Sequence, residues 1–99
     1  MEYLVNLHTV IPDGTPETVV KDTVAREAVR AAELAGQGHI LRMWRPPLQP
    51  GERRALGLWR ADDEGQFRDL LATLPLHVWF SIDITPLSPH PNDPQAARS

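Results

Sequence analysis

The spacing of hydrophobic residues changes along the chain and separates strands from helices. From Tyr3 to Ile11, β-branched and aromatic residues predominate up to a Pro-Asp-Gly turn signal, which predicts a first strand. The residues after this turn carry apolar side chains at steps of three and four, which is the spacing of one helix face. Thr15 is the expected N-cap, Pro16 the first helical residue, and Gly36 and Gly38 the expected end. The apolar stripe of this helix consists of Val20, Val24, Ala28, Ala31 and Ala35.

Three more strand-like segments follow the first helix. Two of them, His39 to Arg45 and Arg53 to Ala61, are separated by residues 46–51, whose prolines cannot continue a strand ladder. The last runs from about His77 to Thr85, and alternation along it puts Trp79 on one face. Its other face holds Val78, Phe80, Ile82 and Ile84. A strand that is apolar on both faces predicts a second subunit packed on the sheet.

A second helix lies between the third and fourth strands. Asp62 or Asp63 is its expected N-cap and Pro75 its expected end. Its buried face is expected to consist of Phe67, Leu70, Leu71 and Leu74. The order of elements predicts a ferredoxin-like α+β fold (βαββαβ), a four-stranded antiparallel sheet with two helices on one face. We assign residues 1–87 to this single domain and residues 88–99, which are polar and rich in proline, to an extended C-terminal arm.

Composition narrows the chemistry that this domain can perform. The chain has no cysteine, which excludes disulfides, zinc–thiolate sites, iron–sulfur clusters and thiol nucleophiles. Its histidines lack metal-ligand spacing and it has no Gly-rich phosphate loop, so we expect neither a metal nor an organic cofactor. The formal net charge of −3 argues against nucleic-acid binding. Since no apolar run approaches the roughly 20 residues of a spanning helix, we expect a soluble cytoplasmic protein that does not bind a membrane.

Glu27 is the carboxylate whose position in the sequence is unusual. At about 100° per residue it lies about 60° from the centre of the apolar stripe, beside Leu34, so it borders the sheet. A carboxyl at the edge of an apolar interface tends to have a raised pKa, which suits a general base working near neutral pH. The alternative, which the spacing alone favours, is that the side chain extends to water or pairs with Arg30, three residues on.

The second strand carries two arginines and a tryptophan close together. Because side chains alternate along a strand, Arg42 and Trp44 share one face and Arg45 lies on the other, so one arginine points toward the helices. That arginine can hold a carboxylate or stabilise an enolate, and the alternative is a surface cation at an edge or subunit boundary. Trp44 can line a pocket, although tryptophans more often belong to a core or an interface. His90, between two prolines of the arm, has a structural role or reaches a neighbouring subunit's site.

Three segments of the sequence resemble the muconolactone isomerase family. They are AREAVRAAELAGQGHILRMWRPP, GLWRADDEGQFRDLLATLPL and ITPLSPHPNDP, and together they cover nearly the whole chain. The most specific pieces are Met43-Trp44-Arg45 at the end of the second strand, the Leu74-Pro75-Leu76 junction and the His90-Pro91 pair of the arm. The order and spacing of these pieces carry the resemblance.

The resemblance implies a ferredoxin-like subunit whose sheets pair into dimers, a dimeric α+β barrel, with dimers assembled into a decamer and arms that reach over neighbours. It also implies a cofactor-free conversion of muconolactone to 3-oxoadipate enol-lactone, in the catechol branch of aromatic compound catabolism. Glu27 matches the family's helix-one glutamate, which moves the proton, and Arg45 matches the arginine that ends strand two. The further candidate substrate-binding residues are Arg42, Trp44, His39 and His90.

One departure from the family concerns Val24, because enzymes of this pathway tend to have a lysine three residues before the glutamate. The negative charge of the dienolate must then be stabilised by another residue. His39 and Arg42 are also positions where identity with those enzymes is not expected, so a related lactone or enone is an alternative substrate. Two other functions share this fold: a cofactor-independent oxygenase or cyclase of the dimeric α+β barrel type, and a non-catalytic oligomer that binds a small hydrophobic ligand.

Overall fold

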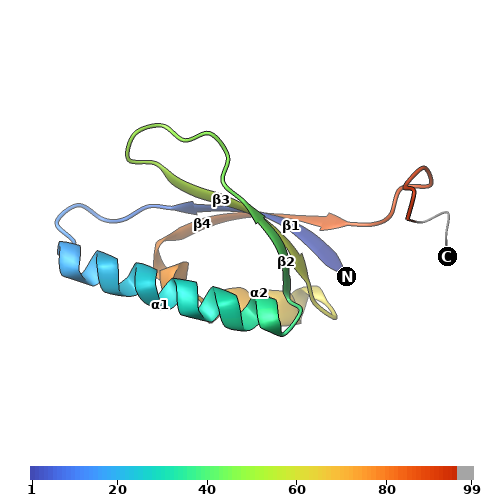
Figure 1. The fold of residues 1–99 in the computed structure, drawn as a ribbon, viewed down its shortest axis with the longest axis horizontal. Helices are drawn as coiled ribbons and strands as arrows, with labels where there is room; N and C mark the ends of the chain where they lie inside the picture. Colours follow the sequence, from blue (N-terminus) through green and yellow to red (C-terminus); the bar gives the residue numbers. More distant parts are fainter. Residues whose placement is uncertain (96–99) are drawn as a thin grey trace.

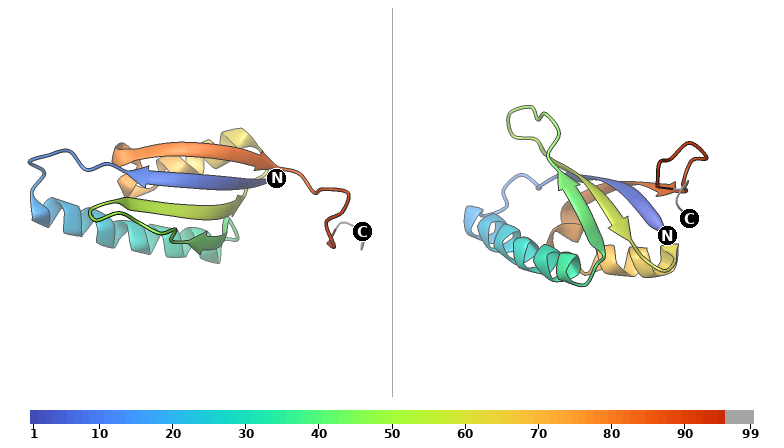
Figure 2. Two further views of the ribbon diagram at one scale, coloured as in Figure 1. Left: turned by 90° about the horizontal axis from the view of Figure 1, so that it is seen from above. Right: turned by 45° about the vertical axis from the view of Figure 1, so that its right-hand side comes forward.

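A computed structural model describes residues 1–95 and places them in one sheet covered by two helices on the same face (Figure 1). The elements are β1 (Glu2–Thr9), α1 (Glu17–Gly36), β2 (Ile40–Trp44), β3 (Arg53–Arg60), α2 (Glu64–Ala72), the 3₁₀ helix η1 (Pro75–Trp79) and β4 (Phe80–Leu87). The strand order is β2-β3-β1-β4, and every neighbouring pair is antiparallel (Figure 2). The predicted ferredoxin-like fold is confirmed.

Helix α1 begins one residue later than the sequence predicts. Pro16 occupies the N-cap position with extended backbone, at φ −57° and ψ 139°, and Glu17 is the first helical residue. The assignment of Thr15 as N-cap is wrong, because its hydroxyl donates a hydrogen bond to the Pro12 carbonyl at 2.6 Å. Thr15 therefore closes the turn before the helix and leaves the first helical amides without a side-chain cap.

Helix α1 ends at glycine, as the sequence predicts. Gly38 adopts φ 84°, a left-handed conformation that glycine reaches without steric cost. The turn directs the amide of Gly38 to the Ala35 carbonyl at 3.1 Å and the amide of His39 to the Leu34 carbonyl at 2.9 Å. These two bonds satisfy carbonyls of the last turn, and the chain then continues into β2.

The core lies between the sheet and both helices, with α2 contributing its aromatic centre. Asp63, one of the two predicted caps, accepts a hydrogen bond from the Gln66 amide at 2.8 Å and fixes the start of α2. Phe67 stacks on Tyr3 with ring centroids 4.4 Å apart and meets Trp59 edge-on at 5.6 Å. The buried hydrophobic residues are Tyr3, Val5, Leu7, Leu34, Ile40, Trp59, Ala61, Phe67, Leu71 and Leu74.

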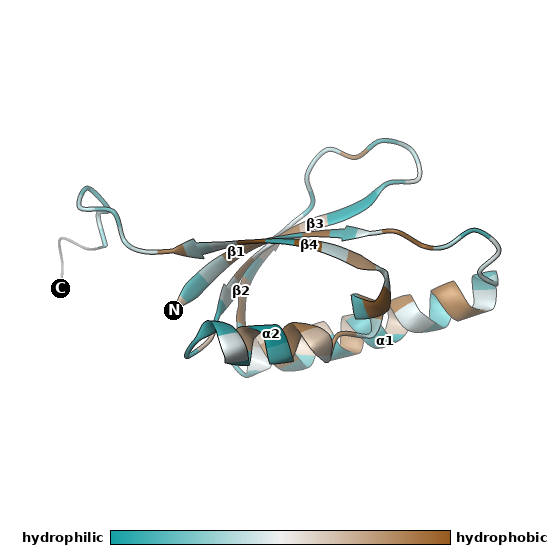
Figure 3. Ribbon diagram, turned by 180° about the vertical axis from the view of Figure 1, so that it is seen from behind, coloured by the Kyte–Doolittle hydropathy of each residue, from teal (hydrophilic) through white to brown (hydrophobic). Residues whose placement is uncertain are grey.

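The segment between α2 and β4 corrects the predicted last strand. Pro75 begins the 3₁₀ helix η1, in which hydrophobic and hydrophilic residues alternate (Figure 3). The strand therefore begins at Phe80 instead of His77, and it extends to Leu87. The side chain of Val78 points to solvent, with 78% of the residue exposed.

The two faces of the sheet differ, and we call the face without helices the outer face. On β4, the residues that pack against the core are Phe80, Ile82 and Ile84. Its outer face carries Ser81, Asp83 and Thr85. The prediction that this strand is apolar on both faces is wrong, since Trp79 belongs to η1. The apolar residues of the outer face come from neighbouring strands and are Leu4, Trp44, Leu56 and Leu58.

Strand β2 contains a β-bulge at Leu41. Ile40 and Arg42 pair with consecutive residues of β3, so Leu41 has no partner of its own. The bulge shifts the alternation, and Ile40 and Met43 both lie on the helix side although they are three residues apart. On the outer face, the guanidinium of Arg42 lies 5.1 Å from the ring centroid of Trp44.

The chain leaves the sheet after β4. Residues 88–95 project beyond the end of the sheet (Figure 2), and the Asp93 amide donates a hydrogen bond to the His90 carbonyl at 2.9 Å. Residues 96–99 of the predicted arm lie outside the described residues, and the division between a domain and an arm stays a prediction. None of the helices within residues 1–95 has the length and apolar character needed to cross a membrane.

Candidate functional site

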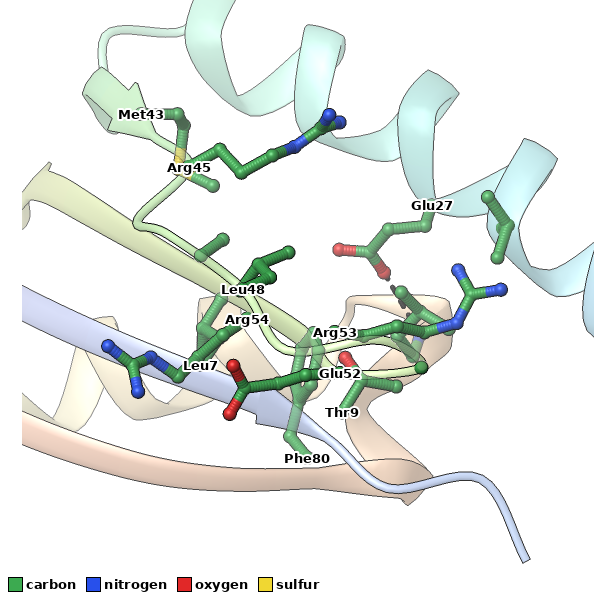
Figure 4. A pocket seen from close by; sticks show the side chains of 14 residues that line it. Leu7, Thr9, Glu27, Met43, Arg45, Leu48, Glu52, Arg53, Arg54 and Phe80 are labelled. Carbon is green, nitrogen blue, oxygen red and sulfur yellow. Dashed lines mark hydrogen bonds between the residues drawn. The ribbon is translucent and has the colours of Figure 1, made fainter.

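A cavity of about 570 Å³ opens between the sheet and α1 (Figure 4). Its position follows from the helix lengths: α1 has 20 residues and α2 has 9, so α2 covers only part of the sheet. Where α2 is missing, η1 and the loop between β2 and β3 border the space. The lining residues are Leu7, Thr9, Val24, Glu27, Met43, Arg45, Leu48, Gly51, Glu52, Arg53, Arg54, Ala55, Leu76 and Phe80.

Glu27 projects from α1 into this cavity. Its Oε1 accepts a hydrogen bond from the Leu76 amide at 2.9 Å, one of the N–H groups left free at the start of η1 after Pro75. Burial raises the pKa of the Glu27 carboxyl above its ordinary value, and the hydrogen bond from Leu76 opposes this with a smaller effect. The alternative pairing with Arg30 is absent, because the Arg30 guanidinium lies 3.8 Å from the Glu33 carboxylate.

Glu27 lies at the centre of the buried face of α1, whereas the sequence placed it at the edge. Thr23 and Leu34 are the buried residues of this helix, and Ala28 and Ala35 of the predicted stripe are exposed. At about 100° per residue, Glu27 is within about 40° of both buried residues. The helix is rotated in this way because Leu34 buries far more apolar area than an alanine does. Glu27 is thereby directed at the sheet.

Two arginines stand opposite α1 across the cavity. Arg45 directly follows β2 and Arg53 is the first residue of β3, so they flank the loop between these strands. In the view of Figure 4 the Glu27 carboxylate lies between their guanidinium groups, while Arg54 points away from α1. Within residues 1–95, neither Arg45 nor Arg53 has a carboxylate partner closer than 4.0 Å. Of the residues predicted for the site, the structure brings Glu27 and Arg45 together.

The other predicted binding residues lie away from this cavity. Arg42 and Trp44 are exposed on the outer face of the sheet. His39 follows the end of α1, and its Nδ1 lies 2.9 Å from the last carbonyl of β3. His90 is exposed in the arm, where its Nδ1 accepts a hydrogen bond from a backbone amide at 3.0 Å. In a single chain, these four residues do not contact the Glu27 pocket.

Arg53 and the Leu76 amide are among the polar groups of the cavity that sequence reasoning missed. Arg53 pairs with Thr9 across the strands, on the same side of the sheet as the core residues; alternation along β3 carries this signal. The Leu76 amide has no signal in the sequence, because its contact with Glu27 depends on how η1 packs against α1. The walls are apolar, and their side chains include those of Leu7, Val24, Met43, Leu48, Leu76 and Phe80.

The arrangement can bind a small anionic molecule with an apolar ring and move a proton on it. The apolar walls would hold the ring, the arginines would attract the anionic groups, and a carboxylate of raised pKa can accept a carbon-bound proton. No cluster of three or more His, Asp or Glu side chains suited to holding a metal ion occurs in residues 1–95.

All of these residues lie within a segment that matches a known family. Residues 1–93 match the family described as muconolactone delta-isomerase. The chain belongs to the muconolactone delta-isomerase family. One member, the muconolactone delta-isomerase of Cupriavidus pinatubonensis, is 29% identical over 92 residues, which are 93% of this chain and 97% of the relative. The muconolactone delta-isomerase of Rhodococcus opacus is 26% identical over 89 residues, covering 90% of this chain and 92% of the relative.

Solved structures show the same fold. A crystal structure of muconolactone isomerase has a TM-score of 0.83 at 22% identity, with 93% of each chain covered. A 5-chloro-2-hydroxyhydroquinone dehydrochlorinase from Burkholderia phenoliruptrix, in complex with 2,5-dihydroxybenzoquinone, has a TM-score of 0.57 at 10% identity and covers 89% of this chain and 94% of its own. The fold of the muconolactone delta-isomerase family is therefore shared with a protein named for another reaction.

Proposed function

We propose that this protein is a cofactor-free isomerase that moves a proton within muconolactone or a closely related unsaturated lactone, in aromatic compound catabolism. The observation that carries this proposal is Glu27, a half-buried carboxyl of raised pKa that the Leu76 amide holds at 2.9 Å beside an apolar cavity. A raised pKa makes the carboxylate a stronger base at neutral pH. Family membership supports the reaction, and the geometry supports the residue. The cytoplasmic location stays a prediction.

The proposed reaction is an allylic proton shift. Glu27 takes the proton from the ring carbon that carries the acetate group, and the freed electron pair forms a new ring double bond. The electrons of the old double bond form a double bond to the carbonyl carbon, and the carbonyl π electrons move onto its oxygen, giving a dienolate. Protonated Glu27 then returns the proton to the carbon next to the carbonyl. One proton leaves and one returns, so the reaction needs neither an oxidant nor a reductant.

The hydrogen bond from Leu76 fixes one oxygen of Glu27 and leaves the other for the proton transfer. From one face of the lactone, this second oxygen can reach the two ring carbons in turn, because only one ring carbon separates them. Arg45 is the proposed partner of the substrate's own carboxylate, since a guanidinium forms two parallel hydrogen bonds to such a group. Val24 stands where the family would have a lysine, so α1 contributes no cation there. The positive charge of the site comes from arginines on the sheet side of the cavity, Arg45 among them.

Turnover of muconolactone tests the proposed function directly. The purified protein is expected to convert muconolactone to 3-oxoadipate enol-lactone and, in D₂O, to introduce deuterium into the product. A protein that binds the lactone but neither isomerises it nor exchanges deuterium would refute the isomerase proposal and favour the non-catalytic binder. Oxygen consumption with a phenolic substrate, without lactone turnover, would favour the oxygenase.

Assembly from dimers is the second part of the proposal. The outer face carries apolar residues from three strands, and on it Asn6 Oδ1 and Arg54 Nε are buried without a hydrogen-bond partner in residues 1–95. A second sheet packed on this face would cover the apolar residues and offer partners to both atoms, forming a dimeric α+β barrel. We propose that such dimers form a decamer in which residues 88–99 cross to neighbours. The residues that this assembly can bring to a neighbouring site are His39, Arg42, Trp44 and His90.

A further inference from the structure

Arg53 is a cation of the cavity to which the mechanism above assigns no role. It is the first residue of β3 and pairs with Thr9, on the side of the sheet that faces the helices. Figure 4 shows its side chain directed toward the α1 side of the cavity, the side from which Glu27 projects. Exposed arginines elsewhere form ion pairs: Arg26 with an aspartate at 2.9 Å and Arg68 with a glutamate at 3.2 Å.

Arg53 has no such partner among the acidic residues of the described chain, although Glu52 is its immediate neighbour. Figure 4 shows the Glu52 carboxylate on the side away from α1. A guanidinium that lines a cavity and is not neutralised there is available to a negatively charged ligand. The helix side of the cavity supplies Val24 and Glu27 but no cation, so the sheet side must supply any positive charge that a ligand meets.

The proposed lactone presents two negative positions during the reaction. One is its permanent carboxylate, joined through a methylene group to the ring carbon that loses the proton. The other is the lactone carbonyl oxygen, on the opposite side of the ring, where charge develops only in the dienolate. A base placed over the ring therefore requires a positive group on each side, and Glu27 lies between Arg45 and Arg53 in the view of Figure 4.

The two ends of the cavity differ in their hydrogen-bond donors. Besides Arg45, Met43 of β2 and Leu48 of the following loop line the cavity, and their side chains donate no hydrogen bonds. Arg53 is paired with Thr9, and both residues line the cavity. Two donors on neighbouring strands match the need of a single oxygen that gains charge, as in other sites that stabilise oxyanions.

We infer that Arg53 is a catalytic residue that donates to the lactone carbonyl oxygen and stabilises the dienolate, with the Thr9 hydroxyl as second donor, while Arg45 binds the permanent carboxylate. This inference rests on the proposed function. Because the charge on the lactone oxygen exists only late in proton removal, Arg53 acts on the transition state more than on the bound substrate. It should therefore govern kcat, whereas Arg45 should govern KM.

Steady-state kinetics with muconolactone separate these roles. Arg53→Met keeps an unbranched, flexible side chain and removes the guanidinium group and its charge; kcat is expected to fall by about a hundredfold to a thousandfold with KM little changed. Arg53→Lys should retain part of kcat, and Arg45→Met should chiefly raise KM. The control is Arg68→Met on α2, outside the cavity, which should match the wild type.

Three outcomes would overturn the assignment of Arg53. They are an Arg53→Met protein with wild-type kinetics, one in which only KM rises, and a Thr9→Val protein that loses more turnover than Arg53→Met. Circular dichroism checks folding, and Arg53→Gln replaces Arg53→Met if the latter does not fold. A wild-type protein without lactone turnover would refute both the proposed function and this inference. An active wild type with an unaffected Arg53→Met variant refutes the inference alone.

Discussion

Replacing Glu27 by glutamine isolates its role as a base. The amide of glutamine has nearly the shape of the carboxylate, and its oxygen can still accept the hydrogen bond from the Leu76 amide that Glu27 accepts at 2.9 Å. The lost function is proton transfer. Removal of a general base typically lowers the rate about a hundredfold to ten-thousandfold. This corresponds to roughly 3 to 5 kcal/mol in activation free energy, at 1.36 kcal/mol for each factor of ten.

The same substitution should stabilise the fold at neutral pH. Burial raises the pKa of Glu27 above its ordinary value of 4.5, so the folded chain holds this proton more tightly than the unfolded chain does. The stability contributed by the protonated carboxyl is complete below pH 4.5 and is lost as pH rises through the folded-state pKa. Glutamine does not ionise, so Glu27→Gln should melt at a higher temperature than the wild type near neutral pH, and this advantage should vanish in acid.

Deuterium exchange and thermal melts measured on the same samples test both expectations. Glu33→Gln is the matched control, because Glu33 lies exposed on the same helix and pairs with Arg30 at 3.8 Å. In the wild type, kcat/KM should fall on the acid side as Glu27 becomes protonated, with an apparent pKa above 4.5. A folded Glu27→Gln protein that exchanges and isomerises at the parental rate would remove Glu27 from the mechanism. A lower melting temperature at neutral pH would contradict the argument from burial.

Four further predictions concern the fold, the cavity wall, the arm and the cofactor. Asp63→Ala removes the N-cap bond to the Gln66 amide and should lower the free energy of unfolding by about 1 kcal/mol without loss of turnover, as measured by urea denaturation. Gly57→Ala would place a methyl group 2.8 Å from the Met43 sulfur; overpacking of roughly 1–3 kcal/mol and reduced turnover are expected, and unchanged kinetics would contradict this. Light scattering should show a smaller oligomer when residues 88–99 are removed, and a monomeric wild type at micromolar concentration would refute the assembly. Exhaustive EDTA treatment should leave turnover intact; activity lost and restored by a divalent ion would argue otherwise.

Elements that depend on short-range chemistry were predictable from the sequence. Asp63 directly precedes the first helical residue and can accept a hydrogen bond from an amide of the first turn, so the start of α2 follows from local bonding. Gly38 ends α1 for a similarly local reason, its backbone conformation. The 3₁₀ helix η1 was not predictable, because an apolar run of this length fits a strand equally well. Packing against α1 decides between the strand and the 3₁₀ helix, and this contact joins residues that are distant in the sequence.

The candidate site was predictable only in part. Glu27 stood out because it is a carboxylate near an apolar stripe, whereas Arg45 was distinguished from Arg42 only by the resemblance to the family. The rotation of α1 was missed, because alanines dominate the predicted stripe and carry little burial energy, whereas Leu34 sets the contact with the core. Arg53 was missed because its partners in the cavity are distant in sequence, and the β-sheet register with Thr9 brings them together.

The bulge at Leu41 gives β2 one residue more than regular pairing with β3 requires. Deleting Leu41 would restore regular pairing while Ile40, Met43 and Arg45 stay on the helix side, so the strand can shorten by one residue without exchanging its faces. What such a deletion would change is the extra twist that a bulge gives its strand, and with it the direction in which Arg45 leaves the end of β2. The direction of the Arg45 side chain can therefore change without a change in the strand register that places the core residues. Loss of the bulged residue would therefore change the shape of the cavity and leave the pairing of the sheet intact.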